Sequence, residues 1–187
     1  VIRCCKGNDK IIAGFGGNSF GRDRRYGDAG NDLLKGGKGN DYLDGGKGKD
    51  KLIGGKNHDE LIGGKGNDKL VGGVGNDILN GGLGRDQIKT GQGRDTIVFN
   101  ALNEGVDTIK DFNTAQDLID LTAIFSAQKY TADNSFAKYV NYVQLDQVGN
   151  ATHVKVDVDG SGAEFTTLAK LNRVQMDTLN SRNFVTE

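Results

Sequence analysis

The sequence predicts an all-β fold, a parallel β-roll (a β-solenoid) capped by a C-terminal antiparallel β-rich domain, and three observations lead there. A nine-residue frame runs unbroken from Gly27 to Val98. Two positions of that frame hold one residue type throughout its 72 residues, which indicates a structural repeat. After Val98 the frame ends, and segments of alternating apolar and polar residues take its place.

The two constant positions define the expected strand and turn of each unit. The sixth position is always aspartate: Asp32, Asp41, Asp50, Asp59, Asp68, Asp77, Asp86 and Asp95. The eighth is always Leu or Ile: Leu34, Leu43, Leu52, Leu61, Leu70, Leu79, Ile88 and Ile97. Because strand side chains alternate, positions seven to nine should form a three-residue strand with the eighth side chain inward. The six residues GGxGxD should then turn the chain, since glycine accepts positive φ.

Two units make one 18-residue coil with a strand on each side, and this coil is too thin to fold unaided. It buries two aliphatic side chains, whereas ordering a glycine-rich chain carries a large entropic penalty. Stacking places alternate aspartates in two files beside turn carbonyls, and calcium prefers such oxygen ligands. Four loops per file leave three gaps, so we expect about six Ca²⁺ ions on the frame. The alternative is that Gly and Asp only form turns, although turns would also accept Asn or Ser at position six.

The pattern GGxGxD followed by x-Leu/Ile-x resembles the RTX nonapeptide of Gram-negative type I secreted toxins, proteases, lipases and adhesins. The resemblance implies calcium ligation by the eight aspartate carboxylates together with loop carbonyls. The loop glycines concerned are Gly36, Gly37, Gly39, Gly45, Gly46, Gly48, Gly54, Gly55, Gly63, Gly64, Gly66, Gly72, Gly73, Gly75, Gly81, Gly82 and Gly84. It also implies a secreted, extracellular protein, which could be associated with the cell surface. Asp28, Asn57 and Thr90 depart from the glycine pattern.

Residues 1–26 contain degenerate repeats. Asp9 and Ile11 keep the spacing of positions six and eight, but Asn18 stands where an aspartate is expected. After a slip in the frame, Asp23 falls at position six and Arg25 at the inward position. A buried arginine is costly without a partner, so we expect an irregular or frayed edge here. The adjacent Cys4 and Cys5 cannot join distant segments.

Residues 99–187 are expected to form a capping and type I secretion domain. Residues 100–124 resemble the segment that closes the roll in RTX proteins, with Asp107, Asp111, Asp117 and Asp120 among apolar residues. A strand meander is predicted over 139–147, 151–159 and 163–171. A short helix and an exposed tail should follow. These features resemble the C-terminal domain of type I secreted adhesins. The Asp157–Glu164 segment is either a hairpin turn or an accessory calcium loop.

Several function classes find no support in the residues. The net charge of −1 offers no basic excess for nucleic acid. No run approaches the roughly 20 apolar residues of a membrane span, and no Sec-type signal is visible. The motifs GxSxG, HExxH and Walker A are absent, and neither His58 nor His153 has a nucleophile nearby in sequence. We therefore expect no enzyme in this chain.

The sequence favours a module that folds on extracellular calcium and carries the secretion signal of a larger exported adhesin or toxin. Its expected partners are calcium and the type I secretion machinery. The alternative is an accessory module of a secreted polysaccharide epimerase or lyase, a protease or a lipase. Lys38, Lys47, Lys56 and Lys65 fill the third position of four consecutive units, so the calcium-loaded roll could bind acidic glycans. These lysines could equally serve only to solvate the loops.

Overall fold

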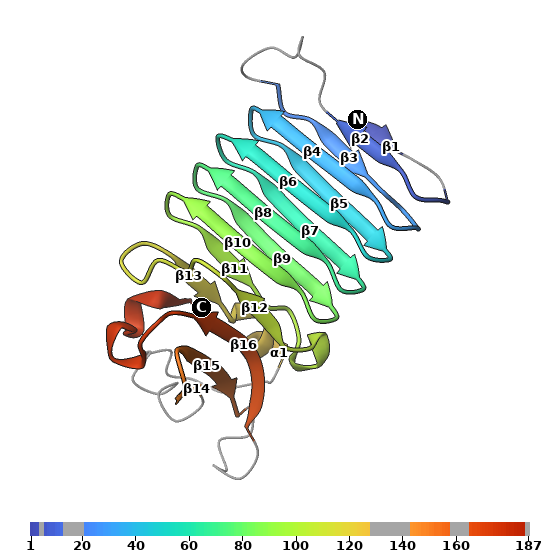
Figure 1. The fold of residues 1–187 in the computed structure, drawn as a ribbon. Coiled ribbons are helices and arrows are strands. Elements are labelled where there is room, and N and C mark those ends of the chain that lie inside the picture. Colours follow the sequence, from blue (N-terminus) through green and yellow to red (C-terminus); the bar gives the residue numbers. More distant parts are fainter. Residues whose placement is uncertain (4–5, 13–20, 128–142, 158–164, 186–187) are drawn as a thin grey trace.

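The chain folds into a parallel β-roll with a cap at its C-terminal end (Figure 1). The computed structural model describes residues 1–3, 6–12, 21–127, 143–157 and 165–185. Successive strands of the roll alternate between two sheets, and each strand pairs in parallel with the strand two positions further along the chain. The predicted all-β roll is confirmed.

One sheet has eight strands and the other nine. The eight-stranded sheet contains β1 (Ile2–Arg3), β3 (Arg24–Tyr26), β5 (Tyr42–Lys47), β7 (Glu60–Lys65), β9 (Ile78–Leu83), β11 (Thr96–Val98), β13 (Leu118–Asp120) and β17 (Phe184–Val185). The nine-stranded sheet contains β2 (Lys10–Ile12), β4 (Leu33–Lys38), β6 (Lys51–Lys56), β8 (Lys69–Val74), β10 (Gln87–Gln92), β12 (Asp107–Ile109), β14 (Val143–Val148), β15 (Ala151–Val156) and β16 (Thr166–Asn172). Within the frame the register is 18 residues, as in the pairing of Leu34 with Leu52.

The strands of the regular coils are longer than the three residues that the sequence predicted. Strands β4 to β10 each span six residues, from position seven of one unit to position three of the next. The ladder skips the first glycine and resumes at the second, as the pairing of Gly37 with Gly55 shows. The second glycine has positive φ, 107° at Gly37, yet still pairs, so the turn shrinks to positions four to six.

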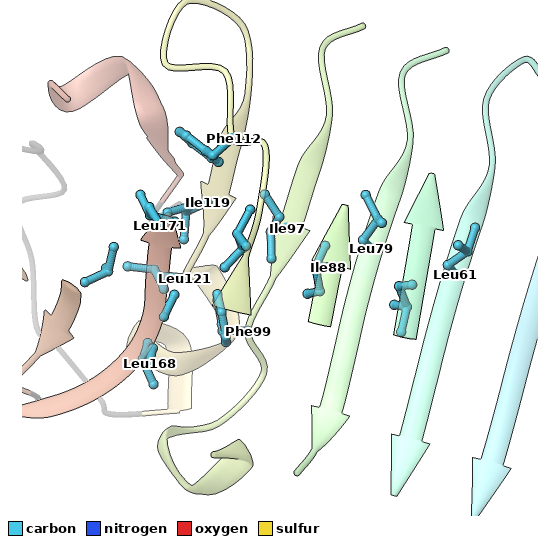
Figure 2. Packing of buried hydrophobic residues seen from close by; sticks show 14 of the residues in the cluster. Leu61, Leu79, Ile88, Ile97, Phe99, Phe112, Ile119, Leu121, Leu168 and Leu171 are labelled. Carbon is cyan, nitrogen blue, oxygen red and sulfur yellow. The ribbon is translucent and has the colours of Figure 1, made fainter. Parts of the chain in front are cut away.

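The core of the roll is a ladder of single aliphatic side chains. All eight position-eight residues, from Leu34 to Ile97, have no solvent exposure. Figure 2 shows Leu61, Leu79, Ile88 and Ile97 succeeding one another along the roll. The apolar interior is one residue wide in each strand, as the sequence predicted.

The roll extends upstream of Gly27 in a more regular form than expected. Ile11 is buried and pairs with Leu34 of β4. Strand β3 pairs with both β1 and β5, and Arg25 occupies the inward place opposite Leu43. The expectation of an irregular edge is therefore wrong for residues 21–26. Arg25 is tolerated because its guanidinium donates to three oxygen acceptors, which are described below. Asn18 lies outside the described residues.

The first cap strands continue both sheets of the roll. Strand β13 pairs with β11 through Thr96 and Leu118, and β12 pairs with β10. The 3₁₀ helix η1 (Leu102–Glu104) and the helix α1 (Thr122–Ala127) flank these strands. The C-terminal region therefore pairs directly with the final coil of the roll at Thr96–Val98. No helix in the described ranges has the length and apolar character to cross a membrane.

The predicted meander is present as β14, β15 and β16. Strand β16 pairs antiparallel with β15 and parallel with β12, which joins the meander to the roll. Two 3₁₀ helices, η2 (Met176–Thr178) and η3 (Ser181–Asn183), take the place of the expected short helix. The tail is not wholly exposed, because β17 pairs with β13 and Phe184 is buried. Most of the Asp157–Glu164 segment lies outside the described residues.

Candidate metal centre

A ladder of aspartate hydrogen bonds runs along each edge of the roll. The Oδ1 of each position-six aspartate accepts the backbone N–H of the aspartate one coil earlier, as in Asp32 N to Asp50 Oδ1 at 2.7 Å. The second file repeats this, with Asp41 N to Asp59 Oδ1 at 2.8 Å. Each N–H is thus satisfied by a carboxylate, and the loops are held in register.

The second oxygen of these carboxylates is buried and has no hydrogen-bond partner in the protein. These orphaned atoms are the Oδ2 atoms of Asp9, Asp32, Asp41, Asp50, Asp59, Asp68, Asp77, Asp86 and Asp95. A buried carboxylate oxygen without a partner is expensive, because it has lost water and gained nothing in exchange. The repetition of the same orphaned atom in every regular coil indicates that a cation belongs beside it.

From Asp32 to Asp86, each orphaned oxygen lies in a cradle, a small space beside the first glycine of its own unit that a Cβ atom on that glycine would fill. A Cβ atom on Gly36 would lie 2.5 Å from Asp41 Oδ2 and 2.6 Å from the carbonyl oxygen of Gly54. A Cβ on Gly45 would lie 2.6 Å from Asp50 Oδ2 and 2.7 Å from Gly63 O. In the units that begin at residues 27 to 72, the first glycine therefore gives one carboxylate and one carbonyl oxygen access to a shared space, whereas beside Gly81 the second oxygen is Asp107 Oδ2. Such oxygens suit Ca²⁺, so the donor set fits that ion.

The second and fourth loop glycines have a different structural role, because they allow the backbones of successive coils to approach closely. Gly37 and Gly39 both have positive φ, and the carbonyls of such glycines face the matching glycine of the next loop. Gly55, for example, lies against the carbonyl of Gly37. The glycines that the resemblance assigned to the sites therefore lie in the stacked loops or at the strand ends that lead into them. Carbonyl oxygens of these loops lie between successive coils.

Burial raises the pKa of the file aspartates well above their ordinary range. The pKa of Asp59 rises to about 7, chiefly because burial disfavours its charge and in part because Asp77 and Asp41 are negative. The pKa of Asp50 rises to about 6 for the same reasons, with Asp68 and Asp32 as neighbours. Two files of ionised carboxylates thus oppose the fold at neutral pH unless a cation neutralises them.

Two aspartates of the cap continue the files, and the sequence frame missed them. Asp107 Oδ1 accepts from Asp86 N at 2.9 Å, and Asp117 Oδ1 accepts from Asp95 N at 3.1 Å. Both are buried, and burial near Asp86 and Glu104 raises the pKa of Asp107 to about 8. Their spacings of 21 and 22 residues, in place of 18, hid them from the nine-residue frame. The signal in the sequence that could have identified Asp107 and Asp117 is the apolar residues that lie close to each of them.

A second, outer ladder runs through position five of the loops. Asn31 Oδ1 accepts from Lys49 N at 2.6 Å, and Asn40 Oδ1 accepts from His58 N at 3.1 Å. His58 Nδ1 in turn accepts from Asn76 N at 2.8 Å. His58 is thus a structural acceptor within the loop stack. Within the described ranges, no three His, Cys, Asp or Glu side chains converge as a metal-binding group.

The exposed residues of the two sheets of the roll differ in charge. Strands β2, β4, β6, β8 and β10 carry seven lysines and no acidic residue: Lys10, Lys35, Lys38, Lys51, Lys56, Lys69 and Lys89. In the other sheet, β5 and β7 include Asp44 and Glu60. The four lysines at position three of consecutive units do not form a single row, because they are divided between the two sheets. Lys38 pairs with Lys56 in one sheet, and Lys47 with Lys65 in the other.

Comparison with protein families identifies the repeat. Residues 26–61, 53–88 and 62–97 match the model of the RTX calcium-binding nonapeptide repeat. Comparison with curated proteins gives no match.

Comparison with solved structures gives matches to two repeat subunits of an epimerase and to a lipase. The AlgE6R3 subunit of the mannuronan C5-epimerase of Azotobacter vinelandii is 28% identical, covers 75% of this chain and 80% of its own, and has a TM-score of 0.57. The AlgE6R2 subunit of that enzyme is 21% identical, with 89% and 92% covered and a TM-score of 0.52. The extracellular lipase LipA of Serratia marcescens is 16% identical, with 97% and 38% covered and a TM-score of 0.40.

Proposed function

Residues 26–97 belong to the RTX calcium-binding nonapeptide repeat family, and we propose that calcium drives the folding of this chain as a module of a larger exported protein. The observation that carries the proposal is the series of buried Oδ2 atoms without partners. Only a cation that binds the folded roll can offset their charge, so binding free energy becomes folding free energy. RTX repeats bind calcium and are not themselves catalytic.

The proposed ligands are the position-six carboxylates and the carbonyls of the loop glycines. In this arrangement Asp41, Asp59 and Asp77 serve one file, and Asp50 and Asp68 the other. About six ions would fill the gaps of the regular frame, and Asp107 and Asp117 would extend the two files into the cap. The support is the place of Oδ2 beside a carbonyl oxygen at the first glycine of the same unit, which holds for the six units from Asp32 to Asp77.

Replacement of Asp68 by Asn tests this ligation. Asn keeps the shape and the Oδ1 acceptor but removes the charge, so the calcium concentration at half-folding should rise several-fold. A calcium titration followed by circular dichroism measures it, with magnesium as the ion that should fail, because it demands tighter octahedral geometry. Asp177→Asn, in the exposed helix η2, is the matched control. An unchanged midpoint for Asp68→Asn would contradict the ligand assignment.

Low cytosolic calcium would leave the repeats unfolded and able to thread a secretion channel, and extracellular calcium would then fold them. RTX repeats occur in secreted Gram-negative proteins, which supports this assignment. The C-terminal domain would carry the type I signal and emerge first. Export of the full chain behind a reporter, through a type I system, tests this. Deletion of residues 173–187 should abolish export, and unchanged export would contradict the signal.

A second candidate is an accessory module that binds an acidic polysaccharide. Two observations favour it: the similarity to the AlgE6R3 subunit and the concentration of lysines on one sheet. Lys51 and Lys69 are register neighbours, so the positive charges form rows along the roll. Affinity for polymannuronate in calcium should fall when Lys38 and Lys56 become Gln. It should not fall when Lys47 and Lys65, on the opposite sheet, are changed. Equal losses from both pairs would contradict a face-specific site.

A further inference from the structure

The inward place of β3 holds a charged residue where every regular coil has Leu or Ile. Arg25 pairs in register with Leu43 and is only 2% exposed. Its guanidinium Nη1 donates to the carbonyl oxygens of Lys35 at 2.8 Å and Gly36 at 3.1 Å. Its Nη2 donates to Asp23 Oδ2 at 2.7 Å. All of these acceptors are oxygens, and Asp23 is a carboxylate.

Two of these oxygens are the local equivalents of the pair that lines each calcium cradle. One coil further along, the pair is Asp41 Oδ2 and Gly54 O. A shift of that pair by 18 residues toward the N-terminus gives Asp23 Oδ2 and Gly36 O, which are the acceptors of Arg25. The Asp23 backbone N–H also donates to Asp41 Oδ1 at 3.0 Å, so Asp23 is a regular member of its file.

The two oxygen pairs differ in whether the protein itself satisfies them. Asp41 Oδ2 is buried without a partner, as are Asp59 Oδ2 and Asp77 Oδ2 in the same file. Asp23 Oδ2 is paired with Arg25. A guanidinium carries one positive charge and a planar fork of donors, which suits a carboxylate and a carbonyl side by side.

We propose that Arg25 is a resident cation that replaces a calcium ion at the N-terminal coil of this file. The Asp23 position of this file is then neutralised by the chain itself and needs no ion. The next coils, which lack such a residue, depend on calcium. The proposal rests on calcium binding at the equivalent oxygens of the regular coils. The N-terminal end of this file therefore offers a preformed place on which its calcium-dependent loops stack.

The test is a count of bound calcium by equilibrium dialysis on the full chain. Arg25→Leu installs the residue type of every regular coil and frees Asp23 Oδ2 and Gly36 O. This variant should bind one more calcium ion than the wild type and should need more calcium to protect the amides of β3 from hydrogen exchange. Arg24→Leu is the control, because Arg24 is on the same strand but lies over the Tyr42 ring at 5.6 Å. It should leave the ion count unchanged.

An unchanged ion count in folded Arg25→Leu would overturn the proposal, whatever happens to the calcium midpoint. If that variant does not fold, the double variant Arg25→Leu with Asp23→Asn decides. It removes both charges together, so the proposal expects it to fold with the wild-type ion count. Failure of the double variant to fold would show that Arg25 acts through packing and would also overturn the proposal. Loss of all calcium binding in the wild type would instead contradict the proposed function.

Discussion

The roll and the cap bury apolar side chains in opposite ways. In the roll, each strand contributes one inward aliphatic residue, such as Leu52 or Leu61, and its interior is a single file. In the cap, side chains from several elements gather around Phe99, as Figure 2 shows for Leu121 and Leu168. A contiguous cluster stabilises a fold by burial, whereas a single file gives little per ordered residue. The cap thus has its own source of stability, and the roll needs ions.

The polar groups of the two regions show the same contrast. Cap side chains find partners within the chain: Thr152 Oγ1 donates to Val174 O at 2.9 Å, and Asn183 Nδ2 donates to Thr114 O at 2.9 Å. The carboxylates of the roll leave one oxygen each without a partner. Protein groups therefore satisfy these buried cap side chains, whereas the described residues of the roll leave the Oδ2 atoms unsatisfied.

Removal of the cap should have the largest effect. A chain ending at Phe99 exposes the final coil and the backbone groups of β11 that pair with β13. Terminal repeats of solenoids need such a cover, so calcium-induced folding should be lost or strongly weakened. Circular dichroism and light scattering during a calcium titration compare the two chains. An unchanged midpoint in a monomeric truncated chain would show that the roll does not depend on the cap.

A single methyl group in a cradle should have the next largest effect. Gly45→Ala places a Cβ within 2.6 Å of Asp50 Oδ2 and 2.7 Å of Gly63 O, so one of these oxygens must move. Such overpacking costs about 1–3 kcal/mol, and the calcium midpoint should rise. Lys47→Ala, exposed on the same strand, is the control and should change little. Equal midpoints for the two variants would contradict the cradle.

Acid should partly replace calcium in the roll. Burial raises the folded-state pKa of Asp59 to about 7 and that of Asp68 to about 6, above the unfolded value near 3.9. Raised carboxyl pKa values favour the fold at low pH, and this stabilisation is lost as pH rises through about 6–7. In chelator, circular dichroism should therefore show more β structure near pH 5 than near pH 7.5. A signal that falls on acidification would contradict the charge account.

Calcium binding should respond to pH in the opposite sense. The ligand carboxylates must be ionised, so the calcium midpoint should rise between about pH 7.5 and pH 5. The same titrations, repeated at both pH values, measure it. A calcium midpoint that does not change with pH would show that Asp59 and the neighbouring carboxylates are not calcium ligands.

The sequence predicted the regular coils well because each position of the nine-residue frame has the same environment in every coil. Position eight of the frame is buried and position six faces the loops, as the constancy of Leu61 and Asp59 indicated. The strand length was underestimated because glycine was assigned to turns, although β4 runs through Gly36 and Gly37 and Gly37 pairs in the ladder. Strand pairing with a residue at positive φ is not visible in a sequence pattern.

The cap acids and Arg25 could not be predicted, for a different reason. Asp107 and Asp117 join the files through insertions of three and four residues beyond the 18-residue register, which only the fold reveals. Arg25 looked unfavourable because its partners, Asp23 Oδ2 and Gly36 O, come together only when coils stack. A repeating pattern identifies the residues that recur at fixed spacing, whereas the roles of these three residues follow only from their contacts in the folded structure.

Hydrogen exchange of the full chain in chelator and in about 1 mM calcium tests the central claim most directly. In chelator, the amides of β5, β7 and β9 should exchange as in an unfolded chain, and those of β15 and β16 in the cap should remain protected. Added calcium should protect the roll and leave the cap nearly unchanged. Equal protection of β5, β7 and β9 with and without calcium would contradict the account, since the roll would then be stable with its carboxylates unneutralised.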